Sequence, residues 1–181
     1  MKKFILQLLF IIVIAGFSPQ IFAQKAEVKW YTFEEAVELN QQEQRKIFID
    51  VYTDWCGWCK KMDTVTFSHP IIAQLLNEKY YAVKFDAESR DTINFAGQQF
   101  INQGNSSRSL HQLARALLQD KMSFPSIAYM NENNQLLTAV PGYYEPEKLE
   151  PILHYFAEDA YKSQSFQEYR NKFQGKITAD N

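Results

Sequence analysis

The chain has 181 residues, with 19 Lys or Arg against 21 Asp or Glu, so its formal net charge is −2. Charged residues make up 22% and aromatic residues 15%, a globular balance that excludes an intrinsically disordered chain. This length accommodates one domain with small additions. A mildly acidic chain has no broad electrostatic attraction to nucleic acid, so nucleic-acid binding is set aside.

The first 23 residues have the pattern of a secretory signal peptide. Two lysines precede an apolar run of 14 residues, 4–17, which only Gln7 interrupts. This run is shorter than the stretch of about 20 residues that a membrane-spanning helix needs. Residues 1–23 are therefore expected to be cleaved after Ala23, which predicts a periplasmic or otherwise exported protein. An uncleaved membrane anchor is the alternative.

After residue 24, strand-like and helix-like patterns alternate along the chain. The expected strands are 28–30, 47–52, 80–85, 126–130 and 136–140, and the last two flank a turn-rich run that indicates a hairpin. The expected helices are one capped by Thr32 with Glu35 three residues on, 57–77 broken around Pro70, 110–118, 145–161 and 163–172. This alternation predicts an α/β fold with a central mixed β-sheet flanked by helices on both faces.

Residues 24–162 are expected to form one domain. Within it, residues 87–122 separate two core strands by far more than a usual loop of about 4–6 residues. We interpret this segment as an insertion that serves partner choice rather than chemistry. Residues 163–181 are expected to be a C-terminal helical extension and tail.

A pair of cysteines, Cys56 and Cys59, stands where an expected strand ends and an expected helix begins. The unpaired N–H groups and the partial positive charge of a helix N-terminus favour a thiolate there. Cys56, with an exposed sulfur and a lowered pKa, is predicted to attack a substrate sulfur. Cys59, one turn later and deeper, would resolve the mixed disulfide.

Other roles for the cysteine pair have less support. A structural disulfide across so short a loop would constrain little chain. A zinc site normally needs four ligands, and the three histidines show no metal-ligand spacing, so no metal is expected. Covalent haem attachment needs histidine directly after Cys59, where Lys60 stands. No nicotinamide or flavin fingerprint occurs, so no cofactor beyond the Cys56–Cys59 disulfide is expected.

The segment 48–62, which contains Trp55-Cys56-Gly57-Trp58-Cys59-Lys60, resembles the active-site strand and helix of the thioredoxin superfamily. Its continuation, residues 63–70, is similar to the C-terminal periplasmic domain of the thiol:disulfide interchange protein DsbD and to related exported thioredoxins. The likeness covers about residues 30–86 and 122–157. It implies a thioredoxin fold, exchange with protein thiol or disulfide substrates, and electrons from a membrane-embedded thiol carrier.

The resemblance also implies supporting residues. Asp50 corresponds to a buried acid that lies behind the disulfide and assists proton transfer at the deeper cysteine. Its place on an apolar strand predicts a raised pKa. Lys84 corresponds to the family lysine near that acid. The alternative to this role is that Asp50 is an ordinary polar residue at the edge of a strand. For Lys84 the alternative is a solvated strand lysine.

The remaining candidate residues concern the substrate groove. Phe124-Pro125 resembles the cis-proline loop, which faces the cysteines and binds an extended substrate chain, with plain strand-edge usage of proline as the alternative. The other residues expected in the substrate groove are Trp55, Gly57, Trp58 and Gly142. Lys60 is expected to support the site. For the two tryptophans the alternative is burial in the core, and for the glycine at position 142 it is a plain turn.

Trp58 stands where the family commonly has proline, which leaves the redox potential and the choice of partner open. Reduction of client disulfides is favoured, because the resemblance is to a domain that delivers reductant. An oxidase or isomerase is the rival within the same class. The rival of another class is a module that binds clients without turnover.

Overall fold

The structure is a computed structural model that describes residues 27–177. The predicted signal peptide, residues 1–23, lies outside the described residues. Within the described range, no helix combines the length and the apolar character that a membrane crossing needs.

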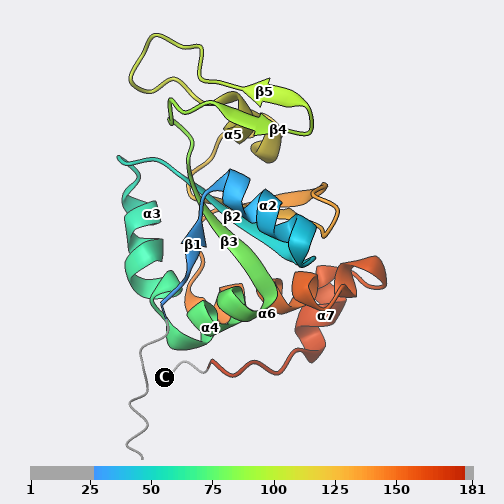
Figure 1. Cartoon of the computed structure of the whole chain (residues 1–181). Coiled ribbons are helices and arrows are strands. Elements are labelled where there is room, and N and C mark those ends of the chain that lie inside the picture. Colours follow the sequence, from blue (N-terminus) through green and yellow to red (C-terminus); the bar gives the residue numbers. More distant parts are fainter. Residues whose placement is uncertain (1–26, 178–181) are drawn as a thin grey trace, which may run out of the picture.

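A mixed five-stranded sheet runs through the centre of the molecule in the order β1-β3-β2-β6-β7 (Figure 1). The strands are β1 (Trp30–Tyr31), β2 (Lys46–Tyr52), β3 (Tyr80–Asp86), β6 (Ser126–Met130) and β7 (Leu136–Pro141). The first three are parallel, β6 runs antiparallel to β2, and β7 pairs antiparallel with β6. The predicted mixed sheet and its terminal hairpin are confirmed.

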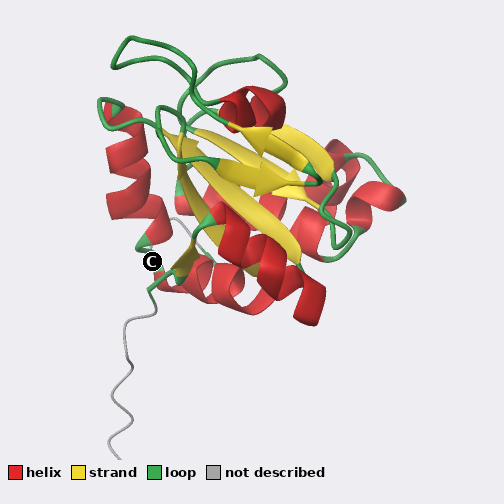
Figure 2. Ribbon diagram, turned by 45° about the horizontal axis from the view of Figure 1, so that its top comes forward, coloured by secondary structure: helices red, strands yellow, loops and turns green. Residues whose placement is uncertain are grey.

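Helices cover both faces of this sheet (Figure 2). One face carries α2 (Phe33–Gln42) and α5 (Gln112–Leu118). The other face carries α3 (Gly57–Lys61), the π-helical segment η2 (Met62–Phe67), α4 (Pro70–Lys79) and α6 (Pro146–Ala157). The short 3-10 turn η3 (Ala160–Lys162) and α7 (Phe166–Lys172) follow, and α7 packs on α6.

The central strand β2 is buried along almost its whole length, as expected of a strand covered by helices on both sides. Successive side chains of a strand point to opposite faces. Ile49 and its alternate neighbours therefore join the core cluster under α2 and α5. Phe48 packs with Met62 and Phe67 on the side of the cysteine helix. Asp50, two residues after Phe48, faces that same side.

Local sequence signals explain where two helices begin. Thr32 and Glu35 form a reciprocal capping box at the start of α2, with N···O distances of 2.8 and 3.2 Å. His69 caps α4 by accepting a hydrogen bond from the Ile71 N–H, and Pro70 occupies the first turn, where its missing N–H costs nothing. The predicted break in the helix is therefore present, whereas the π-helical η2 between α3 and the break was not predicted.

The segment 87–122 is only in part an insertion, which corrects the sequence-based interpretation. It begins with the hairpin of β4 (Ile93–Phe95) and β5 (Gln98–Phe100) and ends with α5. The apolar face of α5 consists of four core residues that are at most 3% exposed: Leu113, Ala114, Leu117 and Leu118. Because α5 packs on β6 and β7, it belongs to the core and not to an added loop.

Candidate active site around Cys56 and Cys59

The two cysteines meet at the N-terminus of α3, where they form a disulfide with a Cα–Cα distance of 5.3 Å. Cys56 is the N-cap residue of the helix, and its Sγ accepts a hydrogen bond from the Cys59 N–H at 3.1 Å. This position also exposes Sγ to the positive end of the helix dipole. A thiolate formed on Cys56 would be stabilised by both.

The sulfur of Cys56 is less exposed than the sequence predicted. Cys56 is 5% and Cys59 2% exposed, so Cys56 is the more accessible of the two, but only slightly. The expected exposed sulfur is therefore wrong for the disulfide form, because Sγ is turned inward, bonded to Cys59 and to its amide. The order of accessibility still matches an attacking Cys56 and a resolving Cys59.

A buried carboxyl lies behind the cysteine helix. Asp50 is 1% exposed, and the Nζ of Lys84 donates to its Oδ2 at 2.6 Å. Lys84 also pairs with Asp63, which is one turn beyond Cys59 on the same helical stretch. The structure thus places Asp50 and Lys84 together at the interface between the sheet and the cysteine helix.

The environment of Asp50 favours its neutral form. Burial raises the pKa of Asp50 to about 6, although the positive charge of Lys84 acts in the opposite direction. Burial alone would lower the pKa of Lys84, but the charges of Asp50 and Asp63 outweigh it and raise that pKa. Among the described residues, Asp50 Oδ1 has no hydrogen-bond partner. A carboxyl with a pKa near neutrality and a free oxygen can accept a proton from Cys59, directly or through water.

The loop before β6 contributes a cis peptide bond between Phe124 and Pro125. The carbonyl oxygen of Pro125 accepts a hydrogen bond from the Gly142 N–H at 2.8 Å. Gly142 has a φ of +103°, a conformation that glycine adopts without steric cost. Gly142 is therefore tied to the cis-proline loop across the β6–β7 hairpin.

An exposed tryptophan directly precedes each cysteine of the disulfide in the sequence. Trp55 is 53% and Trp58 58% exposed, which excludes burial in the core for either. Trp55 packs edge-on against Phe124 with a centroid distance of 6.2 Å, and Trp58 packs against Tyr143 at 5.2 Å. Two aromatic pairs therefore extend from the cysteine loop, one to the cis-proline loop and one to the end of the β6–β7 hairpin.

The other two sequence candidates on this helix make no comparable contact. A Cβ built on Gly57 would meet no atom within 4 Å, so close packing does not require glycine there. Lys60 is exposed on α3. Apart from the backbone hydrogen bond of 3.2 Å that the Lys60 N–H donates to the Cys56 carbonyl, the structure gives neither residue a partner in the cysteine site among residues 27–177.

Sequence reasoning missed several residues around the tryptophans. The Nζ of Lys61 lies over the rings of Trp58 and Tyr143, at 5.3 and 4.9 Å from their centroids. Trp55 Nε1 donates to Glu88 Oε1 at 2.9 Å, and the guanidinium of Arg108 lies 5.4 Å from the Trp55 ring centroid. The sequence offered one indication that Tyr143 belongs to the site, namely its position directly after Gly142. Glu88 and Arg108 had none, because both come from the irregular part of 87–122.

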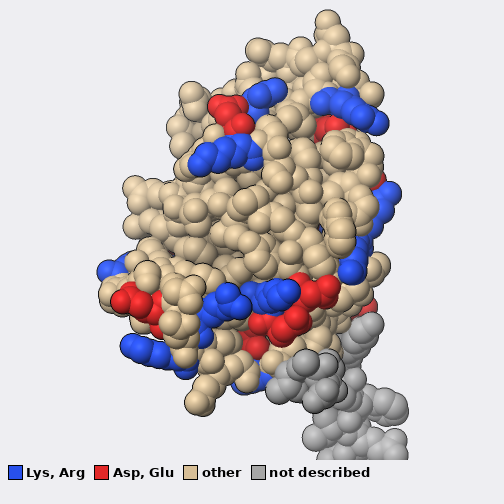
Figure 3. Space-filling view, turned by 180° about the vertical axis from the view of Figure 1, so that it is seen from behind, with Lys and Arg blue, Asp and Glu red and all other residues tan. Residues whose placement is uncertain are grey.

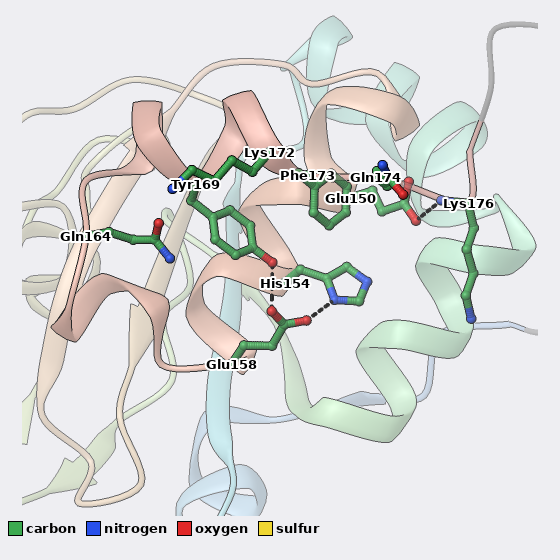
Figure 4. Close-up of a pocket in the computed structure, with 9 residues that line it drawn as sticks. All are labelled: Glu150, His154, Glu158, Gln164, Tyr169, Lys172, Phe173, Gln174 and Lys176. Carbon is green, nitrogen blue, oxygen red and sulfur yellow. Dashed lines mark hydrogen bonds and ion pairs between the residues drawn. The ribbon is translucent and has the colours of Figure 1, made fainter.

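Two further surfaces lie apart from the cysteines. A cavity of about 380 Å³ lies where α7 meets α6, and Glu158 there accepts from Tyr169 Oη and pairs with His154, both at 2.8 Å (Figure 4). On the face opposite α2, a broad central area shows no charged side chain, and a mixed row of basic and acidic side chains crosses the face below it (Figure 3). No group of three His, Cys, Asp or Glu side chains within residues 27–177 is placed to hold a metal ion.

Comparisons with known proteins agree with this geometry. The family model Thioredox_DsbH, described as "Protein of unknown function, DUF255", matches residues 17–173. Spermatogenesis-associated protein 20 of Homo sapiens is 32% identical over 75 residues, 41% of this chain. The chain spans only 10% of the length of that relative. An uncharacterised protein of Archaeoglobus fulgidus is 25% identical over 91 residues, which are 50% of this chain and 72% of that protein.

Solved structures share the fold at low sequence identity. A DsbH oxidoreductase superposes with a TM-score of 0.53 at 18% identity, covering 84% of this chain and 98% of the other. A thioredoxin from Thermus thermophilus gives a TM-score of 0.54 at 16% identity, covering 82% of this chain and 99% of the other. The predicted thioredoxin fold is confirmed, and together with the Cys56–Cys59 pair it supports a thiol–disulfide redox function.

Proposed function

The chain belongs to the thioredoxin-like DsbH family, and we propose that it is an exported thiol–disulfide oxidoreductase that reduces disulfides of client proteins. The observation that carries this proposal is the position of Cys56. It caps α3, is bonded to Cys59, and begins the helical stretch whose Asp63 shares Lys84 with the buried Asp50. The proposed exported location rests on the signal-like pattern of residues 1–23.

The reaction requires the dithiol form of the site. The Cys56 thiolate attacks one sulfur of the client disulfide, forms a mixed disulfide and expels the other client sulfur as a thiolate, which takes up a proton. Cys59 then transfers its proton towards Asp50 and attacks Cys56 Sγ, which releases the second client thiol. The client gains two electrons and two protons, and the Cys56–Cys59 disulfide is formed.

The disulfide must then be reduced by another protein. We propose a membrane-embedded thiol carrier as the donor, because the family resemblance is to domains served in this way. In this scheme two electrons enter by thiol–disulfide exchange at the same cysteines. No resident cofactor is required, since the cysteines alone hold the two electrons between donor and client.

Two measurements test the activity and its direction. The purified protein, reduced beforehand, should reduce insulin disulfides, and its equilibrium potential against glutathione should lie nearer the thioredoxin value of about −270 mV than the oxidising value of about −120 mV. In cells, alkylation trapping should find the pair mostly as a dithiol. A pair that is mostly oxidised in unperturbed cells, with a potential near the oxidising value, would favour an oxidase. Stable mixed disulfides without turnover would favour a client-binding module.

The location is tested separately. N-terminal sequencing of protein from the cell envelope should give a first residue near Gln24. An intact N-terminus in the membrane fraction would instead support the uncleaved anchor.

A further inference from the structure

A polar cavity of about 570 Å³ lies between the loop that follows β5 and the beginning of α5. Its lining residues are Gln103, Gly104, Arg108, Ser109, Leu110, Gln112 and Arg115. The lining includes two cationic side chains and no carboxylate. A local concentration of positive charge in a chain of net charge −2 is not explained by the overall balance.

The loop that forms one wall of the cavity is held in place by side-chain hydrogen bonds to its backbone. The two terminal nitrogens of Arg90 donate to the carbonyls of Gly104 and Ser106, each at 2.5 Å. Asn102 Nδ2 donates to the Ser109 carbonyl at 2.6 Å. A Cβ on Gly104 would lie 2.1 Å from Ser109 Oγ. The loop segments that contain Gly104 and Ser109 therefore approach each other so closely that only glycine fits at position 104. The cavity is thus organised before any ligand binds.

Arg108 connects this cavity to the redox site. Its guanidinium lies 5.4 Å from the ring centroid of Trp55, the residue before Cys56, and Trp55 in turn packs on Phe124 of the cis-proline loop. Figure 1 shows the long loop after β5 on the same side of the molecule as the loop that leads into α3. A guanidinium stacked on an aromatic face keeps N–H donors free at its edge. Arg108 therefore lines both the cavity and the tryptophan wall beside the disulfide.

Both cations of this cavity are available to a ligand, and Arg108 is the one that lies over Trp55. Arg115 pairs with Asp120 at 3.5 Å, but both side chains are at least half exposed, so this pair is weak. Within the described part of the chain, Arg108 forms no ion pair. The nearby carboxylate of Glu88 is engaged by the indole N–H of Trp55. A carboxylate brought by a ligand would find a planar, bidentate donor available.

We infer that this cavity is an anion subsite that binds a carboxylate of the disulfide substrate through Arg108, with Arg115 as the second cation. This inference rests on the proposed function and adds to it a class of substrate. In an extended client chain each residue advances about 3.3 Å, so an acidic side chain a few residues from the client cysteine can reach past Trp55. The carboxylate comes either from such a side chain or from a small acidic disulfide.

The test measures how fast the mature protein reduces matched disulfide substrates. The substrates are pairs of peptide disulfides that differ only in having Glu or Gln at one position. That position is moved in turn through the three residues on either side of the cysteine, and kcat/KM is measured at low and at high salt. At the best position, kcat/KM for the Glu peptide should exceed that for the Gln peptide roughly three- to tenfold, mainly through KM and less so at high salt. Arg108→Gln should bring the ratio to about one, Arg108→Lys should keep part of it, and Arg115→Gln should reduce it. Arg170→Gln, on exposed α7, is the matched control and should leave the ratio unchanged.

A second arm identifies the source of the carboxylate. Dithiodipropionate is compared with uncharged hydroxyethyl disulfide. An acid preference in this pair that Arg108→Gln abolishes assigns the subsite to small acidic disulfides, whereas a preference confined to the peptides assigns it to protein clients.

Two outcomes would overturn the inference: equal rates for Glu and Gln peptides at all positions, or a ratio that Arg108→Gln does not change. Peptide binding to a Cys56→Ser/Cys59→Ser variant separates the inference from the proposed function. A Glu preference there without turnover by the wild type would uphold the subsite and contradict the reductase. Equal binding of the two peptides would contradict the subsite.

Discussion

The ammonium of Lys84 lies 2.6 Å from the buried carboxylate of Asp50, and its second partner, Asp63, stands on the helical stretch that carries Cys59. Lys84 therefore links the central sheet to the redox helix through two carboxylates. Only Asp50 is fully buried; the side chain of Asp63 is 41% exposed. The desolvation of Asp50 consequently dominates the electrostatics behind the disulfide.

Asp50→Asn should stabilise the fold at neutral pH. Burial moves the pKa of Asp50 from 3.8 to about 6, which corresponds to about 3 kcal/mol between its protonation states. Because the pKa is higher in the folded protein, protonation of Asp50 stabilises the fold fully below pH 3.8, and this stabilisation is lost as the pH rises through about 6. Urea denaturation should give the variant a gain of roughly 1–3 kcal/mol at pH 7 and little or none near pH 4.

The same variant should resolve mixed disulfides more slowly, since the proton acceptor is gone. Asp63→Asn is the control, because its partly exposed carboxyl has little desolvation to relieve. If Asp50→Asn is instead less stable than the wild type at pH 7, the ion pair with Lys84 outweighs the cost of burial.

The two cysteines should behave differently when each is replaced. Cys59→Ser should accumulate mixed disulfides with clients, because Cys56 still attacks but nothing resolves the product. Cys56→Ser should trap almost none, since Cys59 is only 2% exposed. Non-reducing gels of trapped complexes read this out, and equal trapping by the two variants would contradict the assigned roles.

Trp58 should matter for clients but little for folding. Its side chain is 58% exposed, so Trp58→Ala should cost less than about 1 kcal/mol of unfolding free energy. Loss of the platform that it forms with Tyr143 should slow insulin reduction roughly threefold or more, because an exposed aromatic pair is a typical anchor for a bound chain. Reduction of hydroxyethyl disulfide should change little.

Val65→Ala is the matched control for Trp58→Ala, since Val65 is an exposed apolar residue of the neighbouring segment η2. Equal effects of Trp58→Ala on insulin and on the small disulfide would mean that Trp58 acts on the cysteines themselves.

Leu117→Ala in α5 should destabilise the protein by roughly 2–5 kcal/mol, the range for removing a buried leucine side chain. Leu117 is 3% exposed, whereas Ala116 beside it is exposed, so Ala116→Ser should have almost no effect. Replacement of residues 87–122 by a short linker should abolish cooperative unfolding in urea. A linker variant that still unfolds cooperatively would contradict the core role of α5 and would support its interpretation as part of an insertion.

The regular elements could be predicted from the sequence because each depends on local pattern. Alternating and continuous apolar runs placed the five strands, and Thr32 and Pro70 marked two helix starts. The core role of α5 was missed because a long separation between strands was interpreted as an insertion, although the spacing of Leu113 and Leu117 is that of a packed helix face. The π-helical η2 has no comparable sequence signal.

The candidate site divides in the same way. Cys56 and Cys59 could be named from their spacing at the start of a helix, and Asp50 and Pro125 from the resemblance to the thioredoxin superfamily. Arg108 and Tyr143 could not, because they reach the cysteine loop only through the folding of an irregular loop and of a hairpin end.

The two residues between the cysteines lie outside the packed interior. A side chain added at Gly57 would meet no atom within 4 Å, and Trp58 is 58% exposed. Substitutions at these positions can alter how well a thiolate is stabilised without creating a cavity or a clash in the core. Selection, or an engineer, can therefore shift the balance between the dithiol and disulfide forms of this domain without repacking its core, and each 30 mV of such a shift corresponds to about 1.4 kcal/mol between the stabilities of the two forms.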